Sequence, residues 1–257
     1  MSVELVVKNL VAEVVLNRPE KMNALNEAAM QTLVERLDAA EKAGVRALIL
    51  RGEGPGFSAG RDLSDSDPFN EDGEAILEKI VNPVIRRVAD FPAPSFAAVH
   101  GPCLGIGLGL ALACDVVYAA DDARIGSPFA RIGAVLDSGA HSFFVQRLGS
   151  HRALELIYTG TLISGREAEA WGLINRSIAK SILLERVRAV AAAVAQGPTA
   201  AFLESKRIVR RIENEGLGLA EVLRSEAKAQ GAASRTADYR EGISAFQSKR
   251  NPRFVGR

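Results

Sequence analysis

The stretch Val99–Asp115, with the sequence VHGPCLGIGLGLALACD, decides the fold of this chain. An apolar strand over residues 94–99 leads through a Gly-Pro turn into a helix of small residues that opens at Gly105. Each glycine in a helix costs about 1 kcal/mol relative to alanine, yet this helix contains Gly105, Gly107 and Gly109. Because glycine has no Cβ, a ligand or another backbone segment can approach such a helix closely.

The first turn of this helix offers free N–H groups and the positive end of the helix dipole, which suit a negative charge. A dinucleotide site expects G-x-G-x-x-G after a strand, but its third glycine position here is Leu110, so the match is partial. A second interpretation is that the glycines only permit close packing. We favour a third, an oxyanion site that stabilises charge formed during a reaction. That site requires a second donor from elsewhere in the chain.

Composition excludes several classes of protein. The chain has 257 residues, enough to bury a large core, and its net charge of +1 favours neither nucleic acid nor a membrane surface. Cys103 and Cys114 form no disulfide framework, which fits a reducing cytoplasm. We see no signal peptide, no membrane-spanning run and no metal-ligand spacing. We therefore expect a cytoplasmic protein without metal or other cofactor, and without nucleic-acid or membrane partners.

The chain divides into an α/β part and a helical part. Strands and helices alternate through the first half, as in βαβ units. From Ser181 onward the pattern is helical, with breaks at Gly197-Pro198 and Glu215-Gly216. We place the core over residues 1–195 and a C-terminal helical region over residues 196–257. Alanine-rich faces in that region can pack on the core or on another subunit.

Four segments together resemble the crotonase superfamily, the enoyl-CoA hydratase/isomerase family. They are Asn17–Leu25 (NRPEKMNAL), Gly56–Leu63 (GFSAGRDL), Gly101–Asp115, and Thr159–Ile174. The resemblance covers nearly the whole chain. It implies an α/β fold of the crotonase (ClpP-like) type, a spiral of ββα units followed by a C-terminal helical trimerisation region. It also implies a coenzyme A thioester as substrate, part of fatty acid metabolism or phenylacetate catabolism, and a homotrimer or dimer of trimers.

The same resemblance supplies the second donor. It places the thioester oxygen between the backbone N–H groups of Ala59 and Ile106. Removing a proton beside a thioester carbonyl creates an enolate, and each donor is worth about 3 kcal/mol in other oxyanion holes. The residues that the resemblance assigns to coenzyme A binding are Lys21, Met22, Ser58, Ala59, Gly60, Arg61, Asp62, Leu63, Gly105 and Phe129, with Phe246 and Lys249 from a neighbouring subunit.

The chain departs from the hydratase pattern of this family. Hydratases use two glutamates, and the matching positions here are Gly109 and Phe129. Hydration needs a base to activate water and an acid to protonate Cα, so efficient hydration by that mechanism is not expected. Asp137 stands where some isomerase branches, including the dienoyl-CoA and epoxyphenylacetyl-CoA isomerases, carry an aspartate. One carboxylate suffices for a 1,3-proton shift, and apolar neighbours should raise its pKa toward the working range.

Three functions remain open from the sequence. We favour an enoyl-CoA isomerase with Asp137 as the base and the amides of Ala59 and Ile106 as oxyanion donors. The alternatives are an atypical enoyl-CoA hydratase that uses His141 or Asp137 with water, and a non-catalytic acyl-CoA-binding protein. Asp137 also has a purely structural interpretation, as the N-cap of a helix over Asp137–Leu148.

Overall fold

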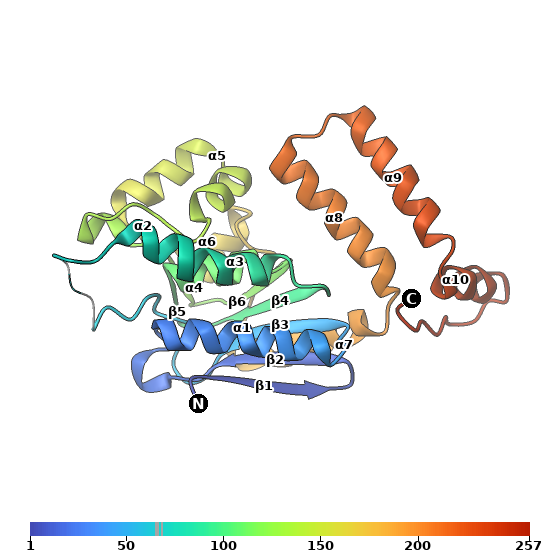
Figure 1. Cartoon of the computed structure of the whole chain (residues 1–257), viewed down its shortest axis with the longest axis horizontal. Helices are drawn as coiled ribbons and strands as arrows, with labels where there is room; N and C mark the ends of the chain where they lie inside the picture. Colours follow the sequence, from blue (N-terminus) through green and yellow to red (C-terminus); the bar gives the residue numbers. More distant parts are fainter. Residues whose placement is uncertain (65–66, 68) are drawn as a thin grey trace.

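A six-stranded sheet forms the centre of the computed structural model, which describes residues 1–64, 67 and 69–257 (Figure 1). Its strand order is β1-β2-β3-β4-β6-β8, antiparallel between β1 and β2 and parallel thereafter. The strands are β1 (Val3–Lys8), β2 (Val11–Leu16), β3 (Ala47–Gly52), β4 (Ser95–Val99), β6 (Val116–Ala120) and β8 (Arg176–Ile178). The central strand β4 is buried along its whole length, as expected for a parallel strand covered on both faces.

A second, smaller sheet carries the short strands that follow the long ones. In it β5 (Pro102–Leu104) pairs in parallel with β7 (Arg124–Gly126), and Ser58 joins through a parallel bridge to Cys103. A long strand, a short strand and a helix therefore recur along the chain. The clearest repeats are β4, β5 and α4 (Ile106–Ala113), then β6, β7 and α5 (Ala140–Thr159). This recurrence confirms the predicted ββα architecture.

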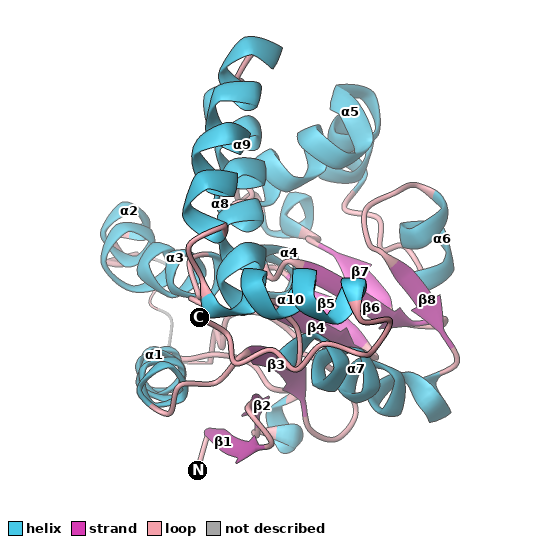
Figure 2. Ribbon diagram, turned by 90° about the vertical axis from the view of Figure 1, so that its right-hand side faces the viewer, coloured by secondary structure: helices cyan, strands magenta, loops and turns pink. Residues whose placement is uncertain are grey.

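Helices cover both faces of the main sheet. Figure 2 shows α1 (Glu27–Lys42) and α7 (Lys180–Ala195) on opposite sides of it. The other elements of the core are η1 (Pro19–Lys21), α2 (Gly73–Ile76), the π-helical turn η2 (Leu77–Val81), α3 (Asn82–Ala89), η3 (Phe129–Ile132) and α6 (Gly165–Ala170). The helix α4 is buried over its full length between α3 and the sheet, which explains its apolar composition.

The C-terminal residues are helical, as the sequence predicts, and form three helices, with a break between Ala233 and Ala237 that the sequence analysis does not predict. They are α8 (Thr199–Glu215), α9 (Leu219–Ala233) and α10 (Ala237–Gln247). The first two form an antiparallel hairpin, drawn in orange and red in Figure 1. Within the part of the chain that the structure describes, no helix combines the length and apolarity needed to span a membrane.

Candidate active site

A cavity of about 470 Å³ lies at the N-terminal end of α4. Three segments surround it: the loop that follows Ser58, the loop between β7 and α5, and the α2–η2 helix. Its lining residues are Ala59, Gly60, Arg61, Leu63, Gly73, Ile76, Leu77, Leu104, Gly105, Ile106, Pro128, Phe129, Ile132, Ala134, Val135 and Asp137. The lining is mostly apolar, and among the residues that the structure describes Arg61 and Asp137 are its charged side chains. Two of the four segments that carry the family resemblance, 56–63 and 101–115, meet at this cavity, whereas segments 17–25 and 159–174 contribute none of its described lining residues.

The three glycines of α4 have different neighbours. Gly105 is the N-cap, with φ at +51°, and borders the cavity, where a Cβ would lie 3.1 Å from the Phe129 ring. At Gly107 a Cβ would lie 2.6 Å from the Cβ of Ser58, and at Gly109 it would lie 2.4 Å from the Cβ of Ser138. Close packing therefore explains Gly107 and Gly109, whereas Gly105 shapes the cavity.

The amide of Ile106 is available to a ligand. Ile106 is the first residue of α4, and the first helical hydrogen bond after it runs from Gly109 N–H to the Gly105 carbonyl at 3.0 Å. Among the described residues, none accepts a hydrogen bond from the Ile106 N–H. This orphan donor is the expected consequence of helix geometry. The predicted donor at Ile106 is therefore compatible with the structure.

The prediction for Ala59 is wrong, because its amide is already bonded. The Ala59 N–H donates to the Met22 carbonyl at 2.9 Å. Two residues later the geometry differs. Leu25 donates to the Gly60 carbonyl at 2.8 Å and accepts from Asp62 N–H at 3.0 Å, so the Arg61 N–H points away from Leu25. That N–H has no hydrogen-bond partner within the described ranges.

The free amides of Arg61 and Ile106 come from segments in direct contact. Gly60 packs against the turn before α4, where a Cβ on it would lie 2.9 Å from the Leu104 carbonyl oxygen. Arg61 directly follows Gly60, and Ile106 lies two residues after Leu104. Both Arg61 and Ile106 line the cavity. Two unpaired N–H groups bordering one cavity form a candidate oxyanion hole. The family resemblance therefore indicates the right loop but the wrong amide.

Asp137 supplies the carboxylate of the cavity. Its Oδ1 accepts a 2.7 Å hydrogen bond from the Ser138 hydroxyl. Burial raises the pKa of Asp137, while the Ser138 hydrogen bond and the charge of Arg61 act in the opposite direction. No ion pair reaches this carboxylate from the described residues. The helix α5 begins at Ala140 with Gly139 as its N-cap, so the interpretation of Asp137 as a helix cap is wrong.

Two residues predicted to bind coenzyme A instead hold the cavity loop. Ser58 is fully buried, and its hydroxyl donates to the Asn23 carbonyl at 2.8 Å, so the predicted substrate contact of this side chain is wrong. Asp62 forms an ion pair with Arg18 at 2.9 Å. Hydrogen bonds from Ser64, with help from Arg18, lower the pKa of Asp62 to about 2. Asp62 therefore stays ionised, and its ion pair with Arg18 joins the cavity loop to the segment that follows β2.

The remaining predicted contacts lie outside the lining of this cavity. Lys21 and Met22 do not line the cavity, and the Met22 carbonyl accepts the hydrogen bond from the Ala59 N–H. Phe246, which is 84% exposed, lies on α10, at the opposite end of the molecule from α2 (Figure 1). Lys249 follows the same helix. His141 is exposed on the first turn of α5 and does not line the cavity.

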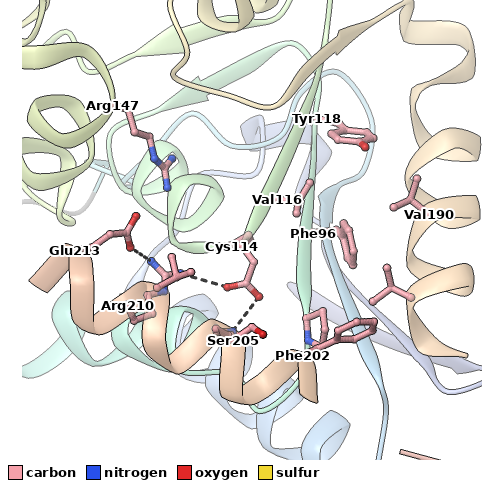
Figure 3. Close-up of a pocket in the computed structure, with 15 residues that line it drawn as sticks. Phe96, Cys114, Val116, Tyr118, Arg147, Val190, Phe202, Ser205, Arg210 and Glu213 are labelled. Atoms are coloured by element: carbon pink, nitrogen blue, oxygen red, sulfur yellow. Dashed lines mark hydrogen bonds and ion pairs between the residues drawn. The ribbon is translucent and has the colours of Figure 1, made fainter. Parts of the chain in front are cut away.

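A second cavity of about 470 Å³ separates α8 from the sheet (Figure 3). Asp115 forms ion pairs with Lys206 at 3.0 Å and with Arg210 at 3.4 Å. Arg210 also forms an ion pair with Glu213 at 3.5 Å, and Figure 3 marks this pair with a dashed line. These charges are paired with one another and join α8 to the core. We therefore assign this cluster a structural role and place the candidate chemistry at the cavity beside α4.

Comparison with known proteins now identifies the family. The family model described as enoyl-CoA hydratase/isomerase matches residues 7–257. The chain belongs to the enoyl-CoA hydratase/isomerase family. It is 36% identical over 247 residues to the 1,2-epoxyphenylacetyl-CoA isomerase of Escherichia coli, covering 94% of both chains. It is 37% identical over 248 residues to a Rhodobacter capsulatus protein named "Probable enoyl-CoA hydratase", covering 96% of this chain and 95% of that protein.

Solved structures of this enoyl-CoA hydratase/isomerase family share the fold. An enoyl-CoA hydratase subunit from Geobacillus kaustophilus superposes with a TM-score of 0.92 at 30% identity, covering 100% of this chain and 99% of that one. An enoyl-CoA hydratase from Bacillus anthracis gives 0.92 at 29% identity, with 100% of both chains covered. The predicted crotonase fold is thereby confirmed.

Proposed function

We propose that this member of the enoyl-CoA hydratase/isomerase family is an enoyl-CoA isomerase that moves a proton and a double bond through an enolate. One observation carries the proposal. In the described part of the chain, Asp137 is the carboxylate that lines the same cavity as the amides of Arg61 and Ile106, which have no hydrogen-bond partner there. Gly109 and Phe129 occupy the positions that the resemblance assigns to the hydratase glutamates.

The cavity residues supply each part of this reaction. The thioester carbonyl oxygen accepts hydrogen bonds from the amides of Arg61 and Ile106. The Asp137 carboxylate takes a proton from Cα of a β,γ-enoyl thioester, and the electron pair of that C–H bond moves onto the carbonyl to give a dienolate. The protonated Asp137 returns the proton to Cγ, the double bond moves to the α,β position, and the carboxylate is restored. The raised pKa of Asp137 suits a group that must both accept and release a proton.

Local packing opposes the hydratase alternative. The Phe129 ring lies against Gly105, and Ser138 fills the space beside Gly109, so neither position offers an acid or a base. His141 lies outside the cavity lining. An acyl-CoA-binding protein without chemistry would keep the free amides but would not need a carboxylate beside them. The half-buried Asp137 carboxylate in this cavity therefore favours the enzyme.

An absorbance assay separates the three functions, because isomerisation creates a conjugated enoyl thioester and hydration destroys one. We expect 3-hexenoyl-CoA to gain this absorbance with the protein, and crotonyl-CoA to keep it. Loss of the crotonyl-CoA signal at a comparable rate would support the hydratase. Tight binding of hexanoyl-CoA with neither change would support the binding protein.

We also propose a homotrimer or dimer of trimers in which Phe246 and Lys249 complete the coenzyme A site of a neighbouring subunit. The position of Phe246 supports this, since it is exposed and remote from the cavity of its own chain. Light scattering checks the assembly, and a monomeric mass would contradict it. In a trimer, Phe246→Ala should raise the Kd for coenzyme A thioesters without changing the mass.

A further inference from the structure

Arg61 contributes its side chain as well as its amide to the cavity. The lining residues described in the structure are otherwise apolar, apart from the Asp137 carboxylate, which accepts hydrogen bonds when ionised. The guanidinium of Arg61 is thus the side-chain donor of this lining. A permanent cation on an otherwise apolar wall is costly unless something binds it.

Glu71 holds the Arg61 side chain in place without using all its donors. The two side chains form an ion pair, and Glu71 stands directly before the N-cap residue of α2, Asp72. A guanidinium has five N–H donors, and one carboxylate engages two of them at most in the bidentate arrangement. The Arg61 side chain is 32% exposed and lines the cavity, and Glu71 is its one polar side-chain partner among the described residues. The pair therefore presents a pre-oriented donor.

This arrangement has a consequence for the acyl group. A hydrocarbon chain would cover the free N–H groups of Arg61 and leave them unbonded, which carries a desolvation cost. An acyl chain with an oxygen acceptor would satisfy them. Glu71 already balances the charge of Arg61, so a carboxylate on the acyl chain would meet uncompensated repulsion from ionised Asp137, which shares the cavity. The favoured substituent is therefore a neutral oxygen.

We propose that the Arg61 side chain is a specificity determinant that selects acyl-CoA thioesters carrying a neutral oxygen acceptor, such as a keto or hydroxyl group, on the acyl chain. The proposal rests on the proposed function in one respect, that this cavity holds the acyl group. It adds the class of acyl chain, and it assigns the Arg61 side chain a role separate from that of its amide.

Binding of saturated thioesters tests this selectivity without catalysis. The Kd of hexanoyl-CoA is compared with the Kd values of 4-oxohexanoyl-CoA and 5-oxohexanoyl-CoA, using the full chain. At least one keto thioester should bind about 10-fold or more tightly than hexanoyl-CoA, the usual worth of a hydrogen bond to a charged group. In Arg61→Met the preference should fall to within about twofold, although the main-chain amide remains.

Two further variants serve as controls for Arg61→Met. Arg131→Met makes the same chemical change on η3, at an exposed residue outside the cavity lining, and should retain the keto preference. Arg61→Lys, which keeps a donor, provides a second variant should Arg61→Met fail to fold. The proposal is overturned if wild type shows no keto preference, or if Arg61→Met and Arg61→Lys both keep the full wild-type ratio.

The same measurements separate this proposal from the proposed function. Asp137-dependent isomerisation of 3-hexenoyl-CoA without a keto preference would refute only the specificity role of Arg61. A keto preference that depends on Arg61, in a protein that isomerises nothing, would refute only the isomerase. Failure of all three thioesters to bind would refute both.

Discussion

Ser138 packs so closely on Gly109 that a Cβ at Gly109 would lie 2.4 Å from the Ser138 Cβ and 2.6 Å from the Ser138 carbonyl oxygen. This contact seats the loop that carries Asp137 on α4. The two features that distinguish the site from the hydratase pattern, the missing glutamate at Gly109 and the carboxylate at Asp137, are therefore physically linked.

Placing the hydratase glutamate at position 109 should consequently not produce hydratase activity. We expect Gly109→Glu to displace the Ser138 loop, lower the free energy of unfolding by about 1–3 kcal/mol as in other overpacked cores, and yield no crotonyl-CoA hydration. Gly109→Ala should show the same clash to a smaller extent. Chemical denaturation and the hydration assay check this. A stable Gly109→Glu variant with hydratase activity would show that the loop contact does not exclude the glutamate.

Replacing Ile106 by proline isolates the amide donor. Proline is tolerated at the first position of a helix, because the missing N–H has no helical partner there. Ile106→Pro should lower kcat by about 100- to 1,000-fold, the usual effect of losing one oxyanion donor, and it should also lower the melting temperature because the Ile106 side chain is fully buried. Ile106→Val keeps the amide and should retain activity. Wild-type kcat in Ile106→Pro would exclude this amide from the mechanism.

The pH dependence of kcat/KM should report the surroundings of Asp137. The base acts in its ionised form, so activity is present above its pKa and is lost as the pH falls through it. Burial raises the pKa of Asp137, and the charge of Arg61 lowers it. Arg61→Met should therefore move the acid limb to higher pH, and Arg61→Lys should move it less. An acid limb that stays in place, or moves to lower pH, would contradict this assignment.

Asp115 should matter to stability rather than to chemistry. Its carboxylate accepts hydrogen bonds from Ser95 N–H at 2.9 Å and Ser95 Oγ at 3.0 Å, and it pairs with Lys206 and Arg210 of α8. Asp115→Ala leaves these partly buried groups unsatisfied, at a cost of about 1–3 kcal/mol in the free energy of unfolding.

A surface pair provides the control for Asp115. Glu215→Ala removes an exposed i,i+4 pair with Arg211 and should lower the free energy of unfolding much less than Asp115→Ala does. Urea denaturation of the two variants checks the difference. Equal stability losses in Asp115→Ala and Glu215→Ala would mean that the ion pairs of Asp115 contribute no more than a surface pair.

The sequence predicted those features that depend on local signals. The Gly-Pro turn and the apolar runs around it predict β4 and α4, and two of the segments that carry the family resemblance, 56–63 and 101–115, line the same cavity. The choice of amide was missed because a non-local contact, Ala59 N–H to the Met22 carbonyl, decides which donor is used up. A signal was present in the strand-like loop, since alternate amides of an extended segment point in opposite directions.

The first residue of α5 also cannot be predicted from the local sequence. Asp is a favoured N-cap, but Ser138 and Gly139 both adopt positive φ, at 56° and 79°, so the helix begins after them. Nothing in the residue types alone forces a serine into that conformation. In this conformation Ser138 contacts Gly109, which lies 29 positions earlier in the sequence. The packing of distant segments therefore determined the environment of Asp137.

Folding controls matter for any variant of Asp137. Its folded-state pKa is raised, so at neutral pH the ionised carboxylate disfavours the folded state relative to the unfolded chain. Asp137→Asn should therefore melt at the same temperature as wild type or higher. A loss of activity in this variant would then not reflect unfolding.

The most direct test is proton transfer itself, measured with wild type and Asp137→Asn. Each is incubated with 3-hexenoyl-CoA in deuterated water, and NMR follows both the label and the position of the double bond. We expect label incorporation and migration of the double bond in wild type, and rates lower by at least about 100-fold in Asp137→Asn, the scale for loss of a general base. Migration at the wild-type rate in Asp137→Asn would contradict the assignment of Asp137 as the base.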